Sequence, residues 1–94
     1  MQLTSRTADT GETLVLAPYK WQPSTYLLVV EGSDTDLSVR GQTPESTIQQ
    51  FLQSMSAILW WTHARNVEEY NRALTLYSLG VNLEQQLETN RHSG

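Results

Sequence analysis

Residues 43–52 read Thr-Pro-Glu-Ser-Thr-Ile-Gln-Gln-Phe-Leu, and at this stretch the chain changes from strand to helix periodicity. Thr43 is a favourable N-cap residue, Pro44 suits the first helical position, and Glu45 lies near the positive end of the helix dipole. After Pro44, neither glycine nor proline occurs before Gly80. The stretch therefore predicts a helix that begins at residue 44.

One face of this predicted helix is apolar, because hydrophobic residues recur at helical spacing. They are Ile48, Phe51, Leu52, Met55, Ile58 and Leu59. Further along, Asn66 is followed three residues later by Glu69, a pattern typical of a second N-cap with a capping box. We therefore predict two helices, over residues 44–65 and 67–89, joined by a tight turn near Asn66. One continuous helix over the same residues is the alternative.

Upstream of residue 43 the chain has the pattern of a β-meander. Residues 12–17 are rich in aliphatic side chains, residues 24–31 (STYLLVVE) contain a continuous apolar run over 26–30, and residues 36–40 alternate between apolar and polar. The continuous run predicts a central strand that is buried on both faces. The predicted fold class is therefore α+β, with a three-stranded antiparallel β-meander followed by two α-helices.

The length of 94 residues suits one domain, residues 1–94. Within it we expect a loose N-terminal arm (1–11), the β-meander (12–41), the two helices (44–89) and a frayed tail (90–94). The lack of cysteine excludes disulfides, thiolate nucleophiles and cysteine-based zinc sites. The apolar runs are too short to span a membrane and no apolar signal region follows the N-terminus, which predicts a cytoplasmic protein.

The charge pattern disfavours two classes of partner. The net charge is −4, and the six Lys and Arg residues are scattered singly. Proteins that bind nucleic acid or an anionic membrane surface use clustered cations, so neither is an expected partner. The low-lysine, glutamine-rich composition is similar to that of small bacterial and phage proteins.

The sequence contains none of the familiar catalytic or cofactor-binding motifs. Patterns such as G-x-S-x-G, the P-loop, G-x-G-x-x-G and H-E-x-x-H do not occur. The two histidines are His63, which we expect to be structural, and His92 in the predicted tail. We therefore expect a protein that is not an enzyme and uses neither a cofactor nor a metal.

Two adjacent tryptophans do not follow the apolar pattern of the first helix. Trp60 and Trp61 project away from its apolar face, beside Ala57 and Ala64. Because tryptophan is enriched at interface hot spots, these four residues are predicted to form a protein-binding patch. The alternative is that the second helix folds back over the indoles and makes them part of the core.

The second helix has two apolar stripes on roughly opposite sides. One consists of Val67, Tyr70, Leu74, Tyr77 and Val81, and the other of Leu76, Leu79, Leu83 and Leu87. A helix with two apolar stripes needs two neighbours, and the sheet of a small domain supplies one. The leucine stripe is therefore predicted to be the contact of a homodimer. Alternatively, the first helix covers one stripe and the sheet covers the other.

Taken together, these patterns favour a small non-enzymatic regulatory or adaptor protein that acts through protein–protein interaction as a homo-oligomer. A phage-type inhibitor and an accessory subunit of a larger complex are forms of this hypothesis. A second hypothesis is an oligomeric small-ligand-binding protein with a pocket near Tyr19, Trp21 and the helix junction. An enzyme with an unrecognised site is the third.

Overall fold

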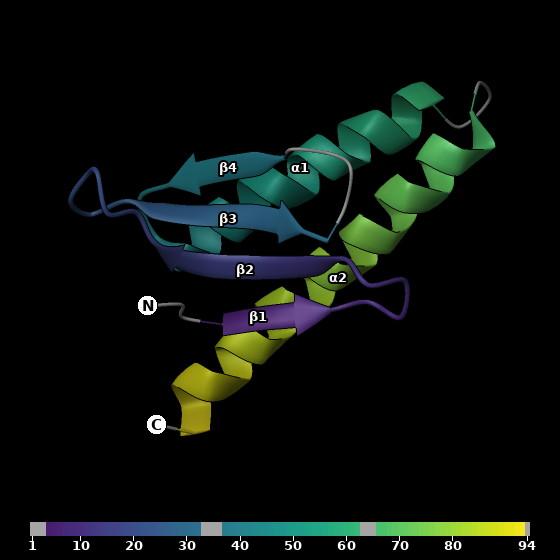
Figure 1. Ribbon diagram of the computed structural model, residues 1–94. Coiled ribbons are helices and arrows are strands. Elements are labelled where there is room, and N and C mark those ends of the chain that lie inside the picture. Colours follow the sequence, from purple (N-terminus) through teal and green to yellow (C-terminus); the bar gives the residue numbers. More distant parts are fainter. Residues whose placement is uncertain (1–3, 33–36, 63–65, 94) are drawn as a thin grey trace.

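The structure, a computed structural model, describes residues 4–32, 37–62 and 66–93, with the backbone alone at 61–62 and 91–93. Its strands and helices are β1 (Thr4–Thr7), β2 (Thr13–Pro18), β3 (Tyr26–Glu31), β4 (Ser38–Gly41), α1 (Pro44–Thr62) and α2 (Val67–Ser93). The strands form an antiparallel sheet in chain order, and both helices lie on one face of it (Figure 1). The predicted α+β class, with an antiparallel meander followed by two helices, is confirmed.

The sheet has one strand more than predicted, because part of the expected loose arm is a strand. β1 pairs with β2, with Ser5 opposite Val15. Gln86 of α2 supports this polar strand by donating hydrogen bonds to Thr4 Oγ1 and, at 3.2 Å, to Ser5 O. The sequence Thr-Ser-Arg-Thr has no apolar alternation, so the usual signal for a strand is missing from β1.

Side-chain caps confirm both predicted helix starts and hence two helices rather than one. Thr43 Oγ1 accepts a hydrogen bond from Ser46 N at 3.0 Å, while Thr43 N donates to Ser46 Oγ at 3.1 Å. Asn66 Oδ1 accepts a hydrogen bond from Glu69 N at 3.1 Å. The described part of α1 extends to Thr62, so residues 63–65 of the predicted first helix lie outside the described residues, and α2 includes residues 90–93 of the expected frayed tail.

The core lies between the sheet and the two helices. It is built mainly from Leu14, Leu16, Leu28, Val30, Ile48, Phe51, Leu52, Met55, Leu76, Leu79 and Leu83. α1 packs on β3 and β4, whereas α2 packs on β1 and β2. Strands are about 4.8 Å apart and packed helices about 8–10 Å apart, so four strands are wide enough for two helices side by side.

The leucine stripe of α2, predicted as the contact of a homodimer, packs against this core within the single chain. Leu76, Leu79 and Leu83 are at most 5% exposed, and Leu87 packs half-buried against the same cluster. Leu76, Leu79 and Leu83 therefore expose little surface to a second copy, whereas Leu87 remains partly exposed. The prediction counted three strands, whereas β1 gives α2 a second neighbour within the chain. The oligomeric state itself stays a prediction.

The opposite face of the sheet is more open. In the part of the chain that the structure describes, both helices lie on the other side (Figure 1). Leu28 and Val30 of β3 are buried under the helices, but Leu27 and Val29 on the open face are half-buried. β3 is therefore a central strand that is buried on one face, not on both as predicted. None of the described helices is both long and apolar enough to cross a membrane.

Candidate functional site

The end of the helical pair carries exposed apolar side chains. Trp60 in the last turn of α1 is 82% exposed, and Val67 at the start of α2 is 71% exposed. In Figure 1 the end of α1 and the start of α2 extend beyond the sheet, so the strands leave this part of the pair uncovered. Exposed aromatic and aliphatic groups on neighbouring elements are typical of surfaces that bind other molecules.

A shallow depression lies between the two helices at this end. Ser56, Leu59, Trp60 and Tyr70 line a volume of about 340 Å³. We call Leu59, Trp60, Val67 and Tyr70 the helix-tip patch. Leu59 and Tyr70 are half-buried, so they form its floor while the Trp60 indole stands beside it.

Acidic side chains flank the helix-tip patch. Glu68 and Glu69 follow Val67 in the first turn of α2, and both are exposed. Their placement near the N-terminus of α2 is favourable, because carboxylates stabilise the positive end of the helix dipole. The same two carboxylates place negative charge beside the patch.

The structure places the four residues of the predicted protein-binding patch as follows. Trp60 and Ala57 are exposed on α1, so α2 does not bury the Trp60 indole as the alternative required. The side chain of Trp61, and Ala64 as a whole, lie outside the described residues. Val67 and Tyr70 were missed as patch residues because the sequence pattern assigned them to a stripe of α2. That these residues bind protein stays a prediction.

The predicted aromatic pocket is not formed as expected. Tyr19 and Trp21 belong to the β2–β3 connection, which lies at the opposite end of the molecule from the adjoining ends of α1 and α2 (Figure 1). Trp21 is 73% exposed, with Lys20 Nζ 5.1 Å from its ring centroid. The Arg40 guanidinium carbon lies 5.4 Å from the Tyr19 ring centroid. Each of these aromatics therefore lies near a cation, at the other end of the molecule from the described ends of α1 and α2.

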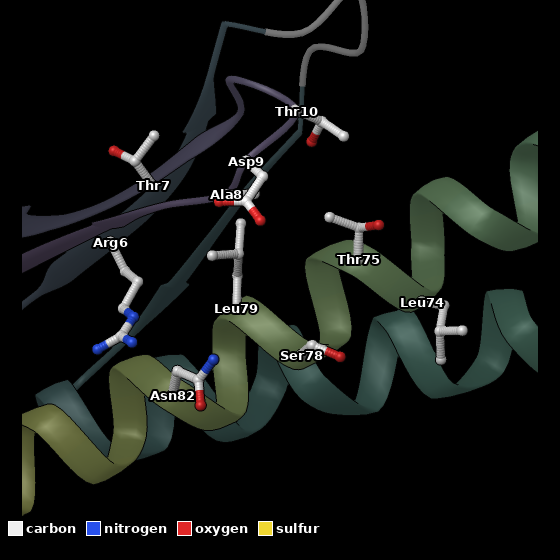
Figure 2. A pocket seen from close by; sticks show the side chains of 10 residues that line it. All are labelled: Arg6, Thr7, Ala8, Asp9, Thr10, Leu74, Thr75, Ser78, Leu79 and Asn82. Carbon is white, nitrogen blue, oxygen red and sulfur yellow. The ribbon is translucent and has the colours of Figure 1, made fainter.

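A more polar groove lies between the β1–β2 hairpin and α2 (Figure 2). Its volume is about 520 Å³, and it is lined by Arg6, Thr7, Ala8, Asp9, Thr10, Leu74, Thr75, Ser78, Leu79 and Asn82. Arg6 Nη1 donates a hydrogen bond to Gln86 Oε1 at 3.3 Å, which ties this cation to the contact between β1 and α2. Among the described residues, the lining consists mainly of hydroxyl, amide and aliphatic side chains, with Arg6 and Asp9 as its charged groups.

Within the described ranges, no three side chains of His, Cys, Asp or Glu form a group that could hold a metal ion. His63 lies outside these ranges, as does the side chain of His92. In comparisons with protein-family models, curated proteins and solved structures, no match to this chain is found. The function is therefore inferred from the chemistry of the protein surface.

Proposed function

We propose that this protein is a regulatory or adaptor protein that acts by binding another protein through the helix-tip patch, without a catalytic step of its own. The observation that carries the proposal is the 82% exposure of Trp60 beside a depression floored by Leu59 and Tyr70. Tryptophan offers a large, rigid apolar surface, so its exposure on a small domain is costly unless a partner covers it.

The charge around the patch defines the chemistry of the partner. Glu68 and Glu69 border the apolar residues, and the chain as a whole carries a net charge of −4. The best match is a protein surface with an apolar side chain that enters the depression and basic groups around it. A second copy would place acidic rims against each other, so the charge favours a different protein.

An inhibitor or an accessory subunit would both act in this way, because each works by occupying a surface of a larger protein. The depression has a volume of about 340 Å³, which suits one or two side chains rather than a folded segment. We therefore expect a contact that is anchored by one apolar residue and surrounded by polar contacts, the arrangement typical of a hot spot.

The test is capture of partners from a lysate of the source cells by the immobilised wild-type protein and by two variants. Trp60→Ala removes the exposed indole of the patch, and Trp21→Ala removes a similarly exposed indole at the other end of the molecule. We expect a protein that the wild type and Trp21→Ala retain and that Trp60→Ala loses. Both variants should melt near the wild-type temperature, because neither indole is buried.

Equal capture by Trp60→Ala and the wild type would exclude the patch as the contact. Light scattering of the same three proteins at micromolar concentration tests the predicted homodimer separately. A dimer that dissociates in Trp60→Ala would identify a second copy as the occupant of the patch, against the charge argument. A dimer that persists in Trp60→Ala would place self-association on another surface.

A further inference from the structure

The two outer edges of the sheet differ. β1 forms one edge, and there Gln86 of α2 donates a hydrogen bond to Ser5 O, so a side chain already occupies part of the outward-facing backbone. β4 forms the other edge. Edge strands present unpaired backbone groups to any extended chain that approaches, unless the protein covers them.

The register of β4 shows which backbone groups face outward. Val30 N donates to Leu37 O at 3.1 Å, and Leu28 lies opposite Val39. Because antiparallel pairs alternate between bonded and non-bonded positions, Leu37 and Val39 direct their N–H and C=O groups toward β3. Ser38 and Arg40 therefore direct theirs outward, and their side chains are exposed on the open face of the sheet.

α1 lies beneath β4 on the helical face of the sheet. It packs against β4, and a Cβ atom on Gly41 would lie 2.9 Å from Thr47 Cα. From there α1 continues beyond the end at which β4 begins (Figure 1). Ile58, eleven residues after Thr47 and so on the same line of the helix, is 36% exposed although the sequence pattern places it on the core face.

A depression of about 470 Å³ marks one end of the same edge. It is lined by Thr25, Arg40, Gly41, Gln42, Ser46 and Gln50. Hydroxyl and amide groups dominate this lining, and Arg40 brings the one charge of β4. A carboxylate on an incoming segment would be attracted to the Arg40 guanidinium.

We propose that the outer edge of β4 binds an extended acidic segment of a partner protein as a fifth strand of the sheet. Its backbone pairs with the outward groups of Ser38 and Arg40, a mode known as β-strand addition. Side chains alternate along the segment, so carboxylates on one side approach Arg40 while apolar groups on the other side cover Ile58. This site is separate from the helix-tip patch, and neither proposal depends on the other.

A second copy of this domain fits the edge less well than a lone segment. Pairing of β4 with β4 of a copy would place the two α1 helices on the same face of one continuous sheet. Strands are about 4.8 Å apart, whereas packed helices need about 8–10 Å. Because α1 packs on both β3 and β4, the two α1 helices would lie only about two strand spacings apart, at the close limit for packed helices, and each copy carries a net charge of −4. An extended segment brings no helix with it.

The probe is a synthetic peptide of about nine residues, acetylated and amidated, in which valine and glutamate alternate. Binding is followed by backbone amide shifts and hydrogen exchange of the full-length protein. We expect shifts centred on Ser38 and Arg40, with slower exchange of these two amides. A peptide with lysine in place of glutamate should bind about tenfold more weakly, because Arg40 then repels it.

Two proline variants test the backbone pairing. Ser38→Pro removes an outward N–H that β3 does not use, and proline is tolerated at such edge positions. Thr7→Pro is the matched control on β1, where Thr7 also faces outward because the next residue, Ala8, bonds to Glu12 O at 2.8 Å. We expect Ser38→Pro to weaken binding about tenfold or more and Thr7→Pro to leave it within about twofold.

A second measurement uses the wild-type protein and so does not depend on folding of a variant. The valine–glutamate peptide is N-methylated at alternate residues, in the two possible phases, which blocks backbone pairing on one edge at a time. One phase should abolish the shifts and the other should retain them. Equal binding by both phases, or shifts away from residues 38–41, would overturn the proposal. A peptide-free dimer that Ser38→Pro dissociates would also overturn it, in favour of a second copy.

Discussion

A Cβ atom placed on Gly80 of α2 would lie 2.7 Å from Leu52 Cδ2 of α1. Phe51 is also close, with its Cδ2 atom 3.2 Å from the same position. Both neighbours are buried in the core, so neither can move away without disturbing its own contacts. The absence of a side chain at residue 80 therefore lets the two helices approach closely enough to lie side by side on four strands.

Gly80→Leu should destabilise the protein by about 1–3 kcal/mol, because the new side chain overlaps Leu52 and Phe51. The gain in helix propensity, about 1 kcal/mol relative to glycine, does not offset this overlap. Urea denaturation measures the change. Gln85→Leu is the matched control, since it introduces the same side chain at an exposed position of α2 and should leave stability within about 0.5 kcal/mol.

Leu83→Ala tests where the leucine stripe lies. The Leu83 side chain is fully buried in the core, so its truncation should cost about 2–5 kcal/mol. Thermal melting and light scattering of the same sample measure stability and mass. A protein that melts normally but loses its dimer would contradict the internal position of Leu83 and restore the oligomer contact.

Gln86→Ala should weaken the attachment of β1. It removes the donor to Ser5 O and to Thr4 Oγ1, and Thr4 is 6% exposed, so its hydroxyl would be left without this partner in a buried site. We expect a loss of about 1–3 kcal/mol and faster hydrogen exchange of the β1 amides. Gln85→Ala, at the exposed neighbouring position, should change neither quantity.

Thr43→Ala should destabilise the start of α1. The Thr43 hydroxyl accepts the hydrogen bond from Ser46 N at 3.0 Å, and alanine cannot replace it. The expected loss is about 0.5–2 kcal/mol by chemical denaturation, whereas Thr43→Ser, which retains the hydroxyl, should stay close to the wild type. Equal losses in the two variants would mean that the threonine methyl group, not the cap, stabilises this end.

Both helix starts could be predicted from sequence because a cap is a local interaction. Thr43 and Asn66 each bond to a backbone N–H three residues away, and no distant part of the chain is needed to form these contacts. Local patterns also located β2, β3 and β4 within about two residues, since runs and alternation of apolar residues mark a strand and turn residues mark its ends. Local hydrogen bonding and periodicity therefore determined the fold class.

The candidate surface could be predicted in part. Helical phase alone directs the Trp60 side chain away from Leu52 and Met55, so its position outside the core followed from geometry. Whether another element covers such a residue depends on where α2 lies relative to the end of the sheet. The 82% exposure of Trp60 is thus a property of the tertiary arrangement, in which the helical pair extends past the strands.

β1 and the place of the leucine stripe were decided by tertiary structure alone. The polar sequence of β1 carries no strand pattern, and the strand is supported by Gln86, which is more than 80 residues away along the chain. Without β1 the sheet is wide enough for one helix, and the sequence pattern then gives Leu83 no partner within the domain. With β1 present, a second helix fits beside the first and Leu83 is fully buried. The physical reason is that sequence periodicity shows which side of a helix is apolar, whereas the width of the sheet sets how many helices can pack side by side on it.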